Sequence, residues 1–175
     1  MSCVLTNGWP LNCRSIAGIQ AVYIGTWQEP GPNSMTFGLT ASGEITSFTG
    51  ATVSFFKFTQ DSEVGSYTEV PNVSIDNGTY FIEGTLEFTL YNYQQTLKNI
   101  VNILGQGRSR VIFLTEDGNY FLLGFQNPVN ISGGNFGVGK AYGELNGAMI
   151  TMTSKEQLGA VQVSSAAAAS VISYS

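Results

Sequence analysis

A single helical pattern stands in a chain that otherwise consists of strand-like runs and turns that contain glycine. Four apolar residues follow an i, i+3, i+4, i+7 spacing and therefore share one face of a helix: Leu97, Ile100, Val101 and Leu104. We expect this helix to cover about residues 92–105, with Asn92 as its N-cap and Gly105 or Gly107 at its end. A lone helix with one apolar face packs most simply on a sheet, so the fold is predicted to be mainly β with one flanking helix.

The strand predictions rest on runs in which apolar and polar residues alternate. In the run that ends at Leu90, Leu86 and Phe88 face one way, whereas Glu83 and Glu87 face the other. Such alternation is typical of a strand that packs one face on a core and exposes the other to water. Together with the shorter apolar runs around it, this strand predicts an antiparallel β-sandwich or split barrel beside the helix.

The 175 residues suffice for one domain with a substantial core. We expect a single domain over residues 1–163, in which residues 1–15 form an irregular arm. Residues 164–175 form a low-complexity Ala/Ser tail, which we expect to be ordered by neighbouring molecules. Residues 61–71 are polar and are expected to form a loop or an extended arm. Residues 132–140 are rich in glycine and are expected to form a loop.

Charged residues are scarce in this sequence. They make up only 11% of the chain, against roughly 25% in ordinary soluble domains. A free monomer with so few charges is poorly protected against association, which favours a subunit whose surface is covered by its own copies. The alternative is a neutral β-domain of the extracellular type. The formal net charge of −5 argues against a bound nucleic acid, because phosphate contacts need clustered Lys and Arg. Only Arg108 and Arg110 lie close together, at an expected solvated strand start.

The sequence offers no membrane, export or metal signal. No run approaches the roughly 20 apolar residues that span a bilayer. The chain up to Asn12 lacks the basic region of a secretory signal, so export by that route is not expected. Cys3 and Cys13 cannot complete a four-ligand zinc site without histidine, which is absent, and we expect them to be reduced thiols.

Catalytic residues are also missing. Without histidine there is no Ser–His or Cys–His pair to activate a nucleophile. Two carboxylate pairs, Glu83 with Glu87 and Glu116 with Asp117, lack the apolar surroundings that would raise one pKa into a working range. We therefore expect no catalytic residue, no cofactor and no metal.

One segment imitates a phosphate-binding loop. Residues 134–140 fit G-x-x-x-x-G-K, but Ala141 stands where Ser or Thr would hold magnesium. Gly143 and Gly147 then precede a strand, whereas a phosphate cradle needs a helix that begins at the lysine. We interpret this segment as a flexible loop between strands.

The order of elements over residues 83–153 resembles the tail-tube, or major tail, proteins of long-tailed bacteriophages. An alternating strand at residues 84–90 leads into the helix, and a hairpin follows whose second strand, residues 120–125, is aromatic. A glycine-rich loop and a closing strand at residues 148–153 complete the pattern. Residues 13–24 also resemble the opening strand of phage structural proteins.

This resemblance implies a β-sandwich with one flanking helix that closes into homo-hexameric rings. In that family, inner strands of neighbouring subunits join into a barrel around a lumen, and the rings stack into a tube that conducts DNA. The implied partners are further copies of the chain, the tape-measure protein and, in contractile tails, a sheath. DNA would pass without specific binding. The implied location is the virion, after assembly in the cytoplasm of the host bacterium.

Two groups of residues are assigned on this basis. Glu83 and Glu87 are expected to line the lumen, because an acidic wall would not grip the DNA that passes. The polar segment at residues 61–71 is the expected contact between rings or subunits, through the following side chains: Asp61, Glu63, Tyr67 and Glu69.

Other functions remain open on the sequence. A different virion β-sandwich protein, such as a tail terminator, a neck protein or a capsid-decoration protein, shares the same features. A carbohydrate-binding or adhesin domain would use exposed aromatic residues as a sugar platform, and Trp9, Trp27 and Tyr67 are the candidates. An enzyme is a third hypothesis, disfavoured by the missing histidine and the incomplete nucleotide loop.

Overall fold

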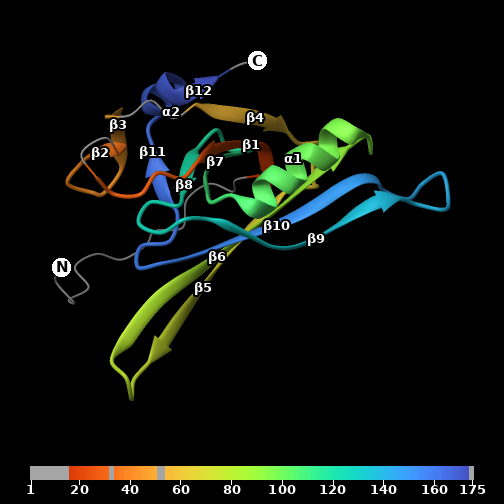
Figure 1. The fold of residues 1–175 in the computed structure, drawn as a ribbon. Helices are drawn as coiled ribbons and strands as arrows, with labels where there is room; N and C mark the ends of the chain where they lie inside the picture. Colours follow the sequence, from red (N-terminus) through yellow and green to blue (C-terminus); the bar gives the residue numbers. More distant parts are fainter. Residues whose placement is uncertain (1–15, 32–33, 51–53, 174–175) are drawn as a thin grey trace.

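The structure is a computed structural model that describes residues 16–31, 34–50 and 54–173. The predicted arm at residues 1–15, with Cys3, Trp9 and Cys13, lies outside the described residues. The described chain forms two β-sheets and two helices (Figure 1). The predicted fold class, mainly β with a flanking helix, is confirmed.

The larger sheet has eight strands in the order β12-β4-β1-β7-β8-β11-β3-β2 and curls on itself (Figure 1). Its strands are β1 (Ile19–Thr26), β2 (Thr36–Leu39), β3 (Ile45–Thr49), β4 (Phe55–Thr59), β7 (Ser109–Thr115), β8 (Tyr120–Leu123), β11 (Val161–Val163) and β12 (Ile172–Ser173). In the middle of β1, side chains are buried on both faces: Ala21, Val22, Tyr23 and Ile24. The sheet therefore separates two cores.

The smaller sheet has four antiparallel strands in the order β5-β6-β10-β9. They are β5 (Ser66–Ser74), β6 (Thr79–Tyr91), β9 (Asn130–Val138) and β10 (Asn146–Glu156). One face of this sheet packs on the larger sheet and forms the first core, which includes Val22, Ile24, Leu86, Phe88, Val111, Phe113, Ile150 and Met152. The predicted sandwich is thus formed by these two sheets.

Helix α1 (Gln95–Gln106) covers one end of the first core. Leu97 is buried, and Val101 and Leu104 pack against the core as the apolar stripe predicts. The predicted N-cap is wrong: the cap residue is Gln94, and Asn92 instead takes a left-handed backbone with φ 66° in the turn after β6. The helix ends at Gly107, whose N–H donates to the carbonyl of Ile103 at 2.9 Å.

The Ala/Ser tail is part of the domain, which corrects the expectation that neighbouring molecules order it. Helix α2 (Ser165–Val171) begins with the Ser164 hydroxyl accepting from the N–H of Ala167, and then buries Ala167 and Ala168. Small side chains let this helix lie close to the concave side of the curled sheet, in the second core, which includes Tyr23, Ile45, Phe55, Ile112 and Leu122. The Ala/Ser composition of this segment therefore reflects a helix that packs closely against the larger sheet.

The C-terminal strands also depart from the predicted antiparallel arrangement. β11 pairs in parallel with β3, and β12 pairs in parallel with β4. Since α2 joins these two strands, it carries the chain across the curled sheet from one parallel pairing to the other (Figure 1). The remaining strand pairs are antiparallel.

Two predicted loops are strands. Much of the polar segment at residues 61–71 belongs to β5, and most of the glycine-rich segment at residues 132–140 belongs to β9. Both are edge strands, held by ladders to β6 and to β10, respectively. An edge strand with little buried surface needs no apolar alternation, so its sequence lacks the signal from which strands are predicted.

Candidate functional site

The four-stranded sheet has one packed face and one open face. Leu86 and Phe88 of β6 are fully buried against the larger sheet. The opposite face is polar and rich in threonine along three of its strands: Thr68, Thr85, Thr151 and Thr153. These four threonines are exposed or half-buried and belong to neither core, whereas Thr89, farther along β6 on the same face, is buried.

Glu83 and Glu87 both lie on this open face, as the alternation predicts. Glu83 pairs across the sheet with Lys155, and its carboxylate lies 3.6 Å from the Lys155 ammonium. Lys155 also lies over the ring of Phe81, 5.8 Å from the ring centroid. The open face of the strands therefore carries two carboxylates against one ammonium, so it is less acidic than expected. Whether these residues line a lumen stays a prediction.

Both edges of the four-stranded sheet are open within the described residues, because β5 and β9 each pair with a single strand. Each of the two edge strands is nine residues long. They expose apolar side chains by 55% to 67%: Val70 and Val73 on β5, and Phe136 and Val138 on β9. The β5–β6 hairpin also projects beyond the rest of the chain (Figure 1). Open edges with exposed apolar residues are pairing surfaces for another chain.

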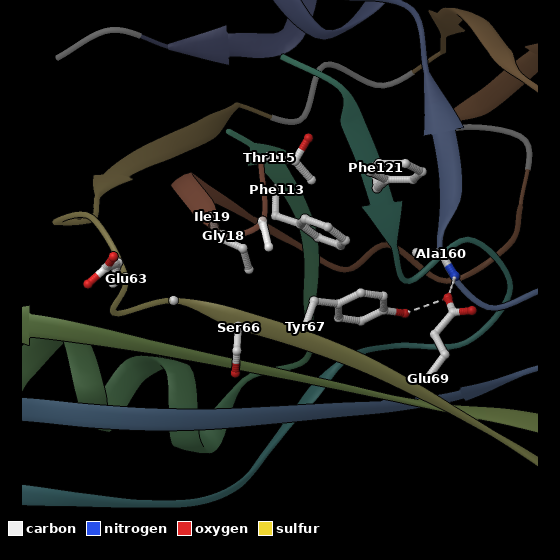
Figure 2. Close-up of a pocket in the computed structure, with 12 residues that line it drawn as sticks. Gly18, Ile19, Glu63, Ser66, Tyr67, Glu69, Phe113, Thr115, Phe121 and Ala160 are labelled. Carbon is white, nitrogen blue, oxygen red and sulfur yellow. Dashed lines mark hydrogen bonds between the residues drawn. The ribbon is translucent and has the colours of Figure 1, made fainter. Parts of the chain in front are cut away.

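The four residues predicted for the subunit contact occupy two different settings. Asp61 and Glu63 lie in the turn before β5, where Glu63 has a left-handed backbone with φ 63°. Tyr67 and Glu69 lie on β5 and point inward, toward the larger sheet. Figure 2 shows Tyr67 and Glu69 on one side of a cavity and Glu63 at its far end. The structure thus brings Tyr67 and Glu69 together and leaves Asp61 and Glu63 in an exposed turn.

This cavity has a volume of about 800 Å³ between β5 and the larger sheet. Its wall is aromatic: the centroids of Tyr67 and Phe113 are 4.6 Å apart, and Phe121 stacks on Phe113 at 5.5 Å. The ring of Tyr67 crosses β6 at Gly84, where an added Cβ would lie 2.6 Å from the Tyr67 hydroxyl. Gly84 is therefore the residue that lets β5 hold an aromatic side chain over the core.

Glu69 fixes the outer end of the Tyr67 side chain. The Tyr67 hydroxyl donates to Oε1 of Glu69 at 2.7 Å, and the N–H of Ala160 donates to the same oxygen at 2.7 Å (Figure 2). Burial and the Glu69 carboxylate both raise the pKa of Tyr67 above its ordinary value. Tyr67 is thus a neutral hydrogen-bond donor to Glu69, and Glu69 ties edge strand β5 to the segment that leads into β11.

A pair of buried charges lies close to the end of β10. Arg110 of β7 and Glu156 of β10 are almost completely buried. Burial lowers the pKa of Arg110 to about 10, although the charge of Glu156 opposes the shift. Burial raises the pKa of Glu156 to about 7, against backbone hydrogen bonds from Asn127, Gln126 and Phe125 and the charge of Arg110. No sequence pattern indicated this pair: Arg110 was expected at a solvated strand start, and that expectation is wrong.

These charges hold the turn after β8. Nε of Arg110 donates to the Gly124 carbonyl at 2.7 Å, and its guanidinium lies over the rings of Trp27 and Phe37 at 4.4 and 5.0 Å. The N–H of Asn127 donates to Glu156 at 3.3 Å. Arg108, by contrast, is exposed and pairs with Glu29 at 2.7 Å. Arg108, just before β7, is thus solvated, whereas Arg110, two residues later, is buried.

The segment that imitates a phosphate-binding loop has a different structure. Residues 134–138 lie in β9, and Lys140 lies in the turn before β10 rather than at a helix start. The N–H groups of Lys140 and Ala141 both donate to the carboxylate of Glu144. The backbone donors that would face a phosphate are therefore occupied by the chain's own carboxylate.

The aromatic residues proposed for a sugar platform do not form one surface among the described residues. Trp27 lies beneath the Arg110 guanidinium, whereas Tyr67 lines the cavity under β5. Trp9 lies outside the described residues. Within the described part of the chain, neither helix is long and apolar enough to cross a membrane. Nor do three or more His, Cys, Asp or Glu side chains gather there in an arrangement that could hold a metal ion.

Comparison with known proteins gives no relative: no family model, no curated protein and no solved structure matches this chain. The geometry of the four-stranded sheet is therefore the main structural evidence on function.

Proposed function

We propose that this chain is a structural, non-enzymatic subunit that joins copies of itself, edge to edge, into stacked rings that form the tail tube of a bacteriophage. The supporting observation is the four-stranded sheet, which has two open edges of equal length and one open polar face. The resemblance of residues 83–153 to tail-tube proteins points to the same role.

The strand directions suit a closed ring. Successive strands of the smaller sheet alternate in direction, so β5 and β9, at the two ends of an even number of strands, run opposite ways. When a rotation about an axis along the strands relates two copies, β9 of one copy meets β5 of the next in antiparallel orientation. The ladder can then continue from copy to copy, and a head-to-tail contact of this kind closes into a ring.

Ring closure would also remove the exposed apolar surface of the free protomer. Val73 of β5 would approach Phe136 and Val138 of β9 in the neighbouring copy, because these side chains lie on the same side of the sheet, whereas Val70 lies on the open face beside Glu83. A closed barrel has no free edge, which eliminates a site of uncontrolled aggregation. The low charge of the chain fits a subunit whose surface is covered in this way.

The open face would then form the wall of the lumen. Its threonines and its two carboxylates, Glu83 and Glu87, offer no cluster of cations to hold DNA, which could pass without specific binding. In this proposal the rings are hexameric, and the tube contacts the tape-measure protein inside and, in contractile tails, a sheath outside. The location is the virion, after assembly in the host cytoplasm.

The test is the mass of the assembly in solution, by size-exclusion chromatography with light scattering, and its shape, by negative-stain electron microscopy. We expect rings or tubes with a central lumen. Val73→Lys, on β5, and Phe136→Lys, on β9, lie on the same side of the sheet, opposite the open face, and should each leave monomers, because each places a charge against the apolar residues of the neighbouring edge. An equimolar mixture of the two variants should form dimers and no rings, because one intact β9 and one intact β5 remain to pair.

The matched control is Leu158→Lys, which places the same charge at an exposed apolar residue in the turn after β10 and should leave the rings intact. A wild-type chain that stays monomeric at high concentration contradicts the proposal, as do rings formed by either edge variant alone. Rings that never stack would favour a tail terminator or neck protein. A monomer retained on a glycan column would favour the carbohydrate-binding alternative.

A further inference from the structure

The tip of the β5–β6 hairpin carries an Asn-Gly dipeptide, Asn77–Gly78. Both residues are exposed, and the neighbouring Ile75 is 91% exposed. Gly78 has a left-handed backbone with φ 63°, and a Cβ built on it would meet no atom within 4 Å. The space beside the Cα of Gly78 is therefore open.

Asn-Gly has an intrinsic chemistry in water. The backbone nitrogen of the glycine attacks Cγ of the asparagine; an N–Cγ bond forms, the Cγ–Nδ2 bond breaks, and ammonia leaves. Water then opens the resulting succinimide at either carbonyl, which gives aspartate or isoaspartate. The reaction needs water alone, but it requires the backbone to rotate freely enough for the nitrogen to reach Cγ.

Little opposes this rotation at the hairpin tip. Nδ2 of Asn77 donates to the Ser74 hydroxyl at 3.1 Å, and the N–H of Gly78 donates to the Ile75 carbonyl at 3.3 Å. Both hydrogen bonds lie within an exposed turn outside the β5–β6 ladder, so breaking them exposes no core. Such turns open at a small fraction of the free energy of global unfolding.

A second Asn-Gly dipeptide, Asn146–Gly147, is held rigidly. Gly147 is buried, pairs with Tyr91 on one side and with Gly137 on the other, and a Cβ on it would lie 2.0 Å from the Leu90 carbonyl oxygen. The Asn146 side chain accepts a hydrogen bond from the N–H of Tyr93 at 3.3 Å. Rotation here would require a three-stranded ladder to separate.

We infer that Asn77 is a site of spontaneous deamidation in the folded protein and that Asn146 is protected by the fold. The modification adds a negative charge beside Asp76, at the end of the projecting hairpin, to a chain whose formal net charge is −5. In the isoaspartate product it also adds one methylene to the backbone of the turn. This inference does not depend on ring assembly.

The experiment is incubation of the full chain in mildly alkaline buffer, followed by tryptic peptide mapping with tandem mass spectrometry. Trypsin cleavage yields one peptide with Asn77, residues 58–98, and another with Asn146, residues 141–155. Asn7–Gly8, which lies outside the described residues, falls in a third peptide. We expect the folded chain to convert Asn77 at least about tenfold faster than Asn146, whereas in denaturant the two should react at similar rates.

Two variants serve as controls. Gly78→Ala adds a methyl group where the structure has room but strains the backbone at φ 63°; because the tip carries no core residue, it should slow conversion of Asn77 severalfold without unfolding the protein. The edge variant Val73→Lys is measured in parallel, so that protection of the tip by assembly is told apart from protection by the fold. Equal rates at Asn77 and Asn146 in the folded monomer overturn the inference, as does an Asn77 that stays intact while the denatured chain converts.

Discussion

The two sheets of this protein bury their side chains in opposite ways. The eight-stranded sheet has a core on each side, so its central strand β1 is buried on both faces. The four-stranded sheet is packed on one face only, and its other face and both edges lie open within the described residues. The larger sheet thus contributes to both cores, whereas the smaller sheet contributes one face to the first core and keeps its other face and its edges open.

The difference separates residues that would serve the proposed assembly from residues that hold the fold. In that assembly, a substitution on the open face or edges would change contacts with a neighbour, while the core remains packed. A substitution on the inner face of the same strands acts on the folded protomer itself. β6 and β10 carry both kinds of residue in alternation, so they offer matched pairs of positions for testing the comparison.

The largest expected effect contrasts the two faces directly. Phe88→Ala, on the inner face of β6, should lower the free energy of unfolding by about 3–5 kcal/mol, because it empties a fully buried site. Met149→Ala, on the open face of β10, should change it by less than about 0.5 kcal/mol, as usual for surface positions. Chemical denaturation of both variants, in the Val73→Lys background to remove assembly, measures the difference. Similar losses would show that the open face is packed after all.

Much of this arrangement could be predicted from the sequence, because the signals are local. The alternation from Leu86 to Leu90 predicted which face of β6 is buried, and the apolar stripe from Leu97 to Leu104 predicted helix α1. The edge strand β9 was predicted as a loop, and the first part of β5 as a loop or an extended arm, because strands that bury little carry no alternation. The second helix was missed because alanine packing is set by tertiary contacts, which composition alone does not show.

The second prediction concerns a charge on the inner side of the sheet. Glu156 has a pKa of about 7 in the folded state, raised chiefly by burial above an ordinary value of 4.5. The folded state therefore binds this proton more tightly than the unfolded state does. Ionised Glu156 destabilises the fold above about pH 7, and this destabilisation disappears as the pH falls toward 4.5. The whole effect is roughly 3 kcal/mol.

Denaturation measured from pH 5 to pH 8 should therefore show stability that falls with rising pH across this window. Glu156→Gln removes the titrating group and should flatten the profile. Glu87→Gln, on the open face of the same sheet, should leave the slope unchanged. The charged and titratable groups that face Glu156 are Arg110 and Tyr67, and neither is expected to titrate between these pH values. A flat wild-type profile would show that Glu156 is solvated.

The site was less predictable than the fold. Glu83 and Glu87 were placed on the correct face, because alternation fixes the face of a strand. Their partner Lys155 could not be assigned, since the β6–β10 register joins residues far apart in sequence. The buried Arg110 and Glu156 were missed for the same reason: a charged residue is buried only when distant segments supply its hydrogen bonds.

The smallest expected effect concerns the ion pair on the open face. Lys155→Met removes the partner of Glu83, yet the free energy of unfolding should change by less than about 1 kcal/mol, because water and salt screen exposed pairs. The measurement is denaturation of the edge-blocked monomer at low and high salt, with the small difference expected to vanish at high salt. Arg108→Met, which breaks the exposed pair with Glu29, serves as the matched control. A loss of several kcal/mol at Lys155 alone would mean that Glu83 is desolvated within the protomer, and the contrast between an open and a packed face would no longer hold.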